Sequence, residues 1–189
     1  YLNLLDWSSQ NQLAVALGPC LYVWSAETGS IDLLFELPDD DNNITSVKWM
    51  EDGSHLAVGT AYNDVQMWNV ERKKQVRSMK GHVARVGALS WNRHILSSGS
   101  RDSTIFNHDV RVADHHIATM RGHEQEICGL AWSPDGSQLA SGGNDNLVCL
   151  WDANGSGVAG SDAHNRAPVH TLTESSAAVK ALAWCPWER

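Results

Sequence analysis

Residues 122–152 read GHEQEICGLAWSPDGSQLASGGNDNLVCLWD, which opens on Gly-His, closes on Trp-Asp and holds short apolar runs separated by turn residues. One tryptophan of this stretch belongs to a series with intervals of 42, 42, 41 and 52 residues: Trp7, Trp49, Trp91, Trp132 and Trp184. A second series consists of Trp24, Trp68 and Trp151, with His108 at the position of its missing member. Self-similarity at a period of about 40–45 residues predicts a repeat protein, usually a propeller of four-stranded blades.

The same stretch predicts how each repeat folds. Strands are expected at 127–132, 138–142 and 147–152, with 168–172 as the outer strand. A Pro-Asp-Gly turn ending at Gly136 joins the first two strands, because glycine there can adopt a positive φ. The Gly-His opening and the Trp-Asp close at this spacing resemble WD repeats. We therefore predict an all-β fold, a WD-repeat β-propeller.

The chain is expected to form a single, partial propeller. At about 42 residues per repeat, its 189 residues correspond to about four and a half blades of a ring expected to have seven. The chain starts inside one blade and stops inside another, so we expect it to be part of a longer propeller, whose strand edges are protected by ring closure. The approximate repeats are 1–40, 41–79, 80–120, 121–172 and a truncated 173–189.

The interval of 52 residues points to an insertion in the fourth repeat. Residues 153–167 are rich in Gly, Ser and Asn and offer little apolar surface. Such a segment gains little burial to offset the entropy lost on ordering. We expect a surface loop that can be replaced by a short linker with almost no change in stability.

Four side chains of the fourth repeat are expected to form a buried hydrogen-bond relay. The resemblance to WD repeats implies contacts that link His123, Ser141, Asp145 and Trp151. The chemistry is consistent, because an indole N–H can only donate and a carboxylate beside an imidazole selects one tautomer. Two repeats depart from this pattern: the third has His108 in place of the tryptophan, and the second has Tyr62 in place of the aspartate.

Composition excludes several classes of protein. No apolar run approaches about 18 residues, so no membrane span is expected, and no basic-then-apolar leader precedes the repeats. The cysteines lack CxxC spacing, which favours packed, reduced thiols over a disulfide framework. They are Cys20, Cys128, Cys149 and Cys185, and the last three are expected in strands.

Charge is unevenly distributed in this chain of net charge −8. Residues 1–47 contain seven acidic side chains and no Lys or Arg, whereas residues 72–121 contain ten basic side chains against three acids. A solvated face explains the basic stretch most simply. The alternative is a second peptide site for acidic segments, with Arg77 and Arg101 as the best candidates. Nucleic-acid binding is not expected, because no aromatic residues alternate with these charges.

No catalytic arrangement is expected. The Ser, His and Asp of each relay resemble a hydrolytic triad, but the relay recurs as a scaffold element and its serine lies within a strand. His115 and His116 lack Cys or carboxylate partners at ligand spacing, which favours a polar loop over a metal site. Gly142-Gly143 opens a turn between strands and not a phosphate-binding helix. The sequence therefore predicts no enzyme activity, no cofactor and no metal.

Several stretches resemble one family in particular, the fizzy and fizzy-related co-activators of the anaphase-promoting complex. The resemblance covers essentially the whole chain, and His108 and the final Cys-Pro-Trp are most similar to the mitotic fizzy branch. The stretches are YLNLLDWS at 1–8, ARVGALSW at 84–91, LSSGSR at 96–101, HDVR at 108–111, QEICGL at 125–130, ASGGNDN at 140–146 and AVKALAWCPW at 178–187.

This resemblance implies a substrate-recognition propeller for a ubiquitin ligase. Family members read short degrons, namely the KEN box, the destruction box and a hydrophobic-acidic motif, and mitotic checkpoint proteins hold them. By position, the KEN-reading residues fall on Tyr22 and Asn144, and Gly18 stands where the family can carry an acid. Only a wall of the destruction-box groove, near Leu5 and Asp6, is expected in this chain. The implied partners are complex subunits, degron-bearing substrates and checkpoint proteins, in the nucleus and cytoplasm.

Two other functions stay open at this point. A general WD-repeat scaffold in another assembly would share the repeats, but its full-length protein would lack an upstream co-activator motif and a terminal Ile-Arg. A propeller hydrolase is the remote third reading, which an activity screen tests.

Overall fold

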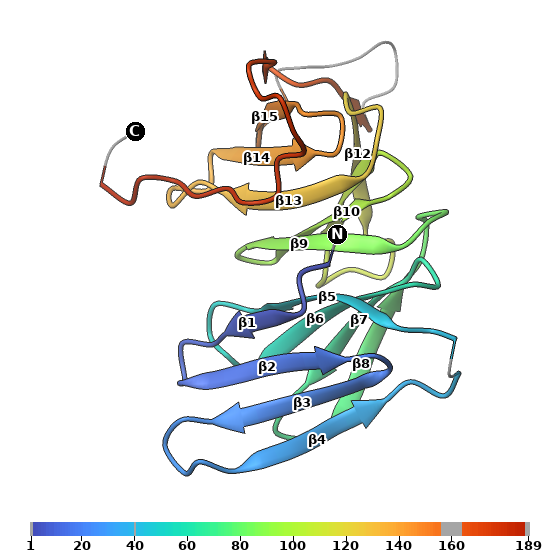
Figure 1. Ribbon diagram of the computed structural model, residues 1–189, viewed down its shortest axis with the longest axis vertical. Helices are drawn as coiled ribbons and strands as arrows, with labels where there is room; N and C mark the ends of the chain where they lie inside the picture. The colour runs from blue at the N-terminus through green and yellow to red at the C-terminus, as the bar shows by residue number, and fades with distance from the viewer. Residues whose placement is uncertain (1, 40, 156–163, 188–189) are drawn as a thin grey trace. The chain divides into compact units, whose positions relative to one another are not determined.

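The computed structural model describes residues 2–39, 41–155 and 164–187, and over these ranges it contains strands and turns but no helix (Figure 1). Its strands form four sheets, so the all-β prediction is confirmed. The described ranges therefore contain no helix that could cross a membrane. The chain divides into two compact units, one spanning Leu2–Leu89 and the other beginning at Ser90.

The N-terminal unit contains two four-stranded antiparallel sheets, each running in chain order. In its second sheet the first strands are buried almost throughout, whereas the last strand is mostly exposed. The first sheet consists of β1 (Leu5–Trp7), β2 (Gln12–Leu17), β3 (Cys20–Ser25) and β4 (Ile31–Glu36). The second consists of β5 (Ile44–Trp49), β6 (His55–Thr60), β7 (Val65–Asn69) and β8 (Lys74–Met79).

The two sheets pack against each other through buried strands such as β6. β6 is nearly continuous in apolar and small side chains because both of its faces are covered. Leu56 and Val58 of this strand belong to the hydrophobic core, together with Leu21 of the first sheet. At Gly59 a Cβ atom would come within 2.5 Å of the Val86 carbonyl oxygen, so this close approach requires glycine.

The C-terminal unit contains the other two sheets, and β9 (Val86–Asn92) crosses the unit boundary. The four strands predicted in the fourth repeat are found to within two residues, and Gly136 has a φ of +72° in the predicted turn. The third sheet continues through β10 (Ile95–Ser100), β11 (Thr104–Asp109) and β12 (His116–Arg121). The fourth consists of β13 (Ile127–Trp132), β14 (Gln138–Gly143), β15 (Val148–Asp152) and β17 (His170–Leu172).

One short strand falls within the segment predicted to be an irregular loop. β16 (Asn165–Arg166) pairs in parallel with β12 and adds a fifth strand to the third sheet. The Thr119 N–H donates to the His164 carbonyl oxygen across 2.7 Å. The prediction for 153–167 is therefore wrong at its C-terminal end, because the open edge of β12 offers backbone partners that composition does not reveal. Residues 156–163 of this segment lie outside the described ranges.

We expect replacement of residues 153–167 by a four-residue linker to destabilise the complete domain. The change removes β16 and the hydrogen bond from Arg166 to the Ala153 carbonyl oxygen, 2.9 Å long. Loss of these bonds should cost about 1–3 kcal/mol. A control that places Gly and Ser at 156–163 only, at unchanged length, should melt like the parent. Equal melting temperatures of the parent and the four-residue-linker variant in thermal denaturation would show that β16 contributes nothing.

The segment that follows β17 contains no strand over its described residues 173–187. The prediction that Cys185 lies in a strand is therefore wrong, since this residue is exposed and precedes Pro186, which has no N–H to donate. Cys128 and Cys149 do lie in strands, and burial raises the pKa of both thiols. None of the four cysteines forms a disulfide.

Candidate functional site

The fourth sheet holds its turn in place through a chain of four hydrogen-bonded side chains. His123 Nδ1 lies 3.0 Å from both carboxylate oxygens of Asp145, and its Nε2 lies 2.8 Å from Ser141 Oγ. Trp151 Nε1 donates to the same serine oxygen across 2.8 Å. With Nδ1–H donating to the carboxylate, Nε2 accepts the serine hydroxyl proton, and every donor of the relay has an acceptor.

The Asp145 carboxylate also ties together two backbone segments. It accepts the N–H of Glu124 across 2.9 Å and the N–H of Leu147 across 3.2 Å. Burial works to raise the pKa of this carboxyl, but hydrogen bonds from Glu124 and His123 outweigh burial and lower it. The ionised carboxylate therefore joins the loop before β13 to the turn before β15.

Asn144 lies in this turn, directly before Asp145, and is half-buried. Its backbone N–H donates to the Glu126 carbonyl oxygen across 2.8 Å, and its side-chain Nδ2 donates to Gln125 Oε1 across 2.5 Å. Gln125 thus orients the Asn144 amide. No role for Gln125 follows from sequence alone, although it stands in the family-like stretch 125–130. The pair presents two adjacent primary amides, which can both donate and accept.

Tyr22 lies in β3 and is half-buried, while the residues on either side of it are buried in the core. Its cross-strand neighbours are Val15 and Leu33. The pKa of its phenol is raised, first by the charge of the Cys20 thiolate and by a hydrogen bond with that thiol, and then by burial and Glu36. The ring therefore adds a polar tip between two apolar cross-strand neighbours.

Leu5 and Asp6 of β1 differ in what they offer to a ligand. Leu5 is 62% exposed. Asp6 accepts hydrogen bonds from Lys48 Nζ (2.6 Å) and from the Trp49 backbone N–H (2.7 Å), and its carbonyl oxygen accepts the Trp49 indole N–H (3.0 Å). The carboxylate of Asp6 is thus engaged in joining the first and second sheets, and Leu5 is the side chain that presents a free apolar surface.

The other candidate positions lie on strand β8 and in two turns. Arg77 is half-buried on β8, and Arg101 is exposed in the turn after β10. Gly18 has a φ of +62° in the two-residue turn between β2 and β3, a backbone conformation that favours glycine over most residues with side chains. The N-terminal unit holds Leu5, Asp6, Tyr22 and Arg77, and the C-terminal unit holds Arg101, Asn144 and the relay.

The second repeat contains a polar network that was not predicted from the sequence. Trp68 Nε1 donates to Gln66 Oε1 across 3.0 Å, and Gln66 Nε2 donates to Asp64 across 3.1 Å. Asp64 also accepts a hydrogen bond from the Thr60 hydroxyl. Tyr62, at the position of the relay aspartate, is 53% exposed. The available signal was the two-residue spacing of Asp64, Gln66 and Trp68, which points alternate side chains to one face.

In the third repeat, His108 takes over part of the tryptophan's role. Its Nε2 lies 2.9 Å from Ser98 Oγ, and its Nδ1 lies 3.0 Å from His115 Nδ1. His115 is therefore a contact of the buried histidine, and one of the two facing Nδ1 atoms must be unprotonated to accept. No group of three or more metal-ligating side chains occurs within the described ranges.

The fourth relay does not present an accessible nucleophile. Ser141 has no exposed surface, and its hydroxyl group is hydrogen-bonded to both His123 and Trp151. A hydrolytic serine must reach a substrate carbonyl from an exposed turn. The arrangement therefore stabilises the fold around Asn144 and leaves the exposed turn residues to make contacts.

Comparison with known proteins places this geometry in a family. The CDC20/Fizzy WD40 domain model matches residues 1–189. The chain is 54% identical over 188 residues to "Anaphase-promoting complex subunit cdc20" of Dictyostelium discoideum and to "WD repeat-containing protein slp1" of Schizosaccharomyces pombe, covering 100% of this chain and 36% of each relative. It is 49% identical over 189 residues to "Cell division cycle 20.1, cofactor of APC complex" of Arabidopsis thaliana, covering 40% of that relative.

A solved structure supports the same conclusion. A chain in a crystal structure of the mitotic checkpoint complex matches with a TM-score of 0.92 at 54% identity, covering 100% of this chain and 54% of that chain. The chain thus spans less than half the length of the curated relatives named here. Both the predicted propeller fold and the predicted resemblance are confirmed. The chain belongs to the CDC20/Fizzy WD40 domain family.

Proposed function

We propose that the protein acts as a substrate-recognition co-activator of the anaphase-promoting complex, a ubiquitin ligase of the cell cycle. The observation that carries this proposal is the whole-chain match to relatives named as a subunit or cofactor of that complex. Its partners are subunits of the complex, degron-bearing substrates and mitotic checkpoint proteins, the last supported by similarity to a chain of the checkpoint complex. Nucleus and cytoplasm are the compartments in which it works.

The degron that this chain reads most directly is the KEN box, through Tyr22 and Asn144. Support comes from the turn of Asn144, which the Asp145 carboxylate anchors on both sides, and from the amide of Gln125 beside it. A fixed amide can pair with polar degron groups without a large loss of side-chain entropy. Tyr22 supplies an aromatic surface with a hydroxyl at its tip. The exposed Leu5 is a wall of the destruction-box groove.

The role is recognition and not catalysis. The buried and fully engaged hydroxyl of Ser141 supports this inference, because the relay has no free group to attack a substrate. The exposed polar and apolar groups on turns and strand faces are instead suited to holding peptide segments.

Peptide binding by the full-length protein tests the proposal. A KEN peptide on beads should retain the protein, whereas a peptide with alanine at all three degron positions should not. Equal retention on the two peptides would overturn KEN recognition. Co-purification with the anaphase-promoting complex tests the co-activator role separately.

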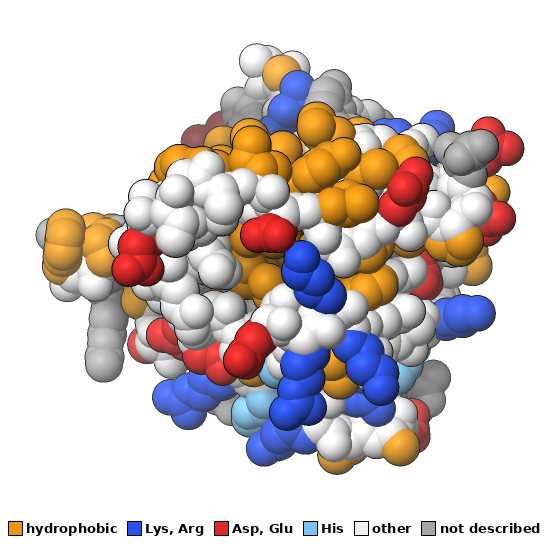
Figure 2. Space-filling model, turned by 90° about the horizontal axis from the view of Figure 1, so that it is seen from below, with side chains coloured by type: hydrophobic (Ala, Val, Ile, Leu, Met, Phe, Trp, Pro, Cys, Tyr) orange, Lys and Arg blue, Asp and Glu red, His pale blue; other side chains and the backbone are white. Residues whose placement is uncertain are grey.

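Arg77 is the proposed anchor of a second peptide site, for hydrophobic-acidic motifs. Figure 2 shows Lys and Arg side chains gathered over the outer strand of the second sheet, where Arg72, Lys73 and Lys74 are exposed near Arg77. Such a field attracts acidic segments, and a half-buried arginine can pair with a carboxylate in a defined geometry.

We expect the charge reversal Arg77→Glu in the full-length protein to weaken binding of a hydrophobic-acidic peptide by about 1–2 kcal/mol, because an attractive charge pair becomes repulsive. Lys74→Glu on the same strand is the matched control and should have a smaller effect, since Lys74 is more exposed than Arg77. Isothermal titration of both variants measures the difference. Parent-like affinity of Arg77→Glu for every acidic motif tested would remove this site.

A further inference from the structure

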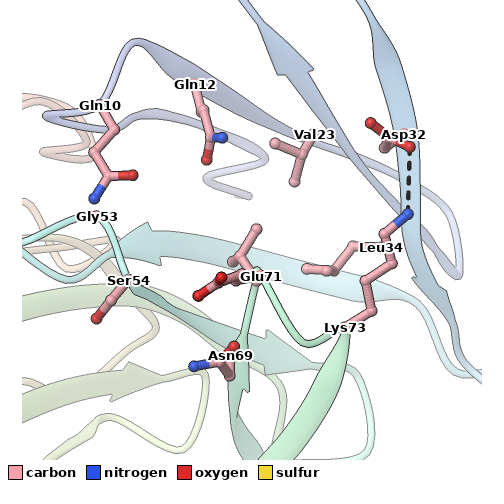
Figure 3. A pocket seen from close by; sticks show the side chains of 11 residues that line it. Gln10, Gln12, Val23, Asp32, Leu34, Gly53, Ser54, Asn69, Glu71 and Lys73 are labelled. Atoms are coloured by element: carbon pink, nitrogen blue, oxygen red, sulfur yellow. Dashed lines mark hydrogen bonds and ion pairs between the residues drawn. The ribbon is translucent and has the colours of Figure 1, made fainter.

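The N-terminal unit contains a slot of about 400 Å³ between its two sheets (Figure 3). Leu5, Tyr22 and Arg77 do not line it, whereas Lys73 of the basic stretch near Arg77 does. The turns β1–β2, β5–β6 and β7–β8 surround the slot together with part of β4. The turn before Tyr22 lies at the opposite end of the first sheet, because successive turns of an antiparallel sheet alternate between its ends. The slot is therefore a recognition surface separate from the proposed KEN-box and destruction-box sites.

One side of the slot is apolar. Val23 and Leu34 are buried core residues whose side chains point into the slot in Figure 3, and Val70 continues this surface from the second sheet. The aliphatic stem of a long cationic side chain covers such a surface while its charged end reaches polar groups.

Two glutamines offer amide oxygens to a ligand in the slot. Gln10 donates its Nε2 to the Asp52 carbonyl oxygen across 2.8 Å, which leaves Gln10 Oε1 as an acceptor. The Asn69 amide is engaged by the backbone N–H of Arg72 and by His55. Gln12 adds a half-buried primary amide whose side chain can turn its oxygen toward a donor.

The slot also contains one uncompensated negative charge. Lys73 Nζ lies 3.3 Å from Asp32 Oδ1 and closes one end of the slot, so these two charges offset each other. Glu71 has no ion pair or hydrogen bond to its carboxylate among the described residues. Figure 3 draws this carboxylate in the space between Gln12 and Ser54. A ligand that fits must therefore bring a positive charge and several donors on a long apolar stem.

We propose that the slot binds an arginine side chain of a partner protein, independently of degron reading. The guanidinium pairs with the Glu71 carboxylate and donates to the amide oxygens of Gln10 and Gln12. The aliphatic stem packs on Leu34 and its apolar neighbours. Arginine fits better than lysine because its planar head carries five donors and is more weakly hydrated than an ammonium group. The charged side chains that line the slot are Asp32, Glu71 and Lys73, and this net negative charge favours a cation at Glu71 although Arg72 and Lys74 are exposed beside it.

The test uses the full-length protein and acetyl-Gly-Arg-Gly-amide as the probe, with the citrulline peptide as its neutral isostere. Ligand-observed NMR titration should give a Kd of about 1 mM for the arginine peptide, and no saturable binding for the citrulline peptide. Glu71→Gln should weaken binding about fivefold, as expected for one partly exposed charge pair. Glu27→Gln, an exposed acid in the β3–β4 turn outside the slot, should leave binding unchanged.

A variant that binds the arginine peptide more tightly than the parent cannot owe its effect to misfolding. Gln12→Glu places a second carboxylate on the facing wall and should tighten binding of the arginine peptide about threefold. The proposal is overturned if the arginine peptide does not bind, if citrulline or lysine peptides bind equally well, or if Glu71→Gln and Glu27→Gln weaken binding equally. The last result would mean that only the general acidic field attracts the probe.

Discussion

Asp145→Ala should destabilise the complete domain by about 2–4 kcal/mol. The substitution removes the acceptor of three donors at once, namely His123 Nδ1 and the backbone N–H groups of Glu124 and Leu147. Because the His123 side chain has no exposed surface, its freed N–H cannot turn to water without local opening. Chemical denaturation monitored by tryptophan fluorescence gives the free energy of unfolding directly.

The matched control is Tyr62→Ala, at the equivalent position of the second repeat. Tyr62 is 53% exposed, and the acceptor for Trp68 comes from Gln66 instead, so its removal should cost clearly less. Equal losses of unfolding free energy in the two variants would show that the relay contributes no more to stability than the exposed side chain of Tyr62.

Asn144→Ala should leave the fold intact and weaken KEN-peptide binding by about 1–3 kcal/mol. The relay and the backbone bond from Asn144 to Glu126 do not involve the side chain that is removed, so the turn keeps its shape. Polar groups of the degron lose their partner and are left unpaired in the complex. Calorimetry with the full-length protein, after circular dichroism has shown a folded variant, measures the loss.

Gln125→Ala distinguishes the direct contact of Asn144 with the degron from the orientation of the Asn144 side chain. Gln125 accepts the Asn144 amide N–H and holds its rotamer, so this variant should lose less affinity than Asn144→Ala and lose it through an increased entropic cost. An Asn144→Ala protein that is folded and binds the KEN peptide like the parent would exclude this residue from the site.

The candidate site was only partly predictable from sequence. Trp151, His123, Ser141 and Asp145 could be named because the fourth repeat keeps all four residue types at their usual spacing. Tyr22 and Asn144 followed from family position alone, and Gln125 became visible only where its amide meets Asn144. The position of a residue within a repeat indicates its place in the fold. It does not reveal the residue's hydrogen-bond partners, which come from a different loop.

The sequence by itself determined the main strands and the tight turn of the fourth repeat. Strand period and turn chemistry are local, so the strands of the fourth repeat and the turn at Gly136 could be placed from neighbouring residues. The tertiary structure alone decided the pairing of β16 with β12, the Asp64–Gln66–Trp68 network and the slot beside Glu71. Each of these depends on which edge, face or side chain is left open after the sheets form, and that is set by non-local packing and not by the spacing of residues along the chain.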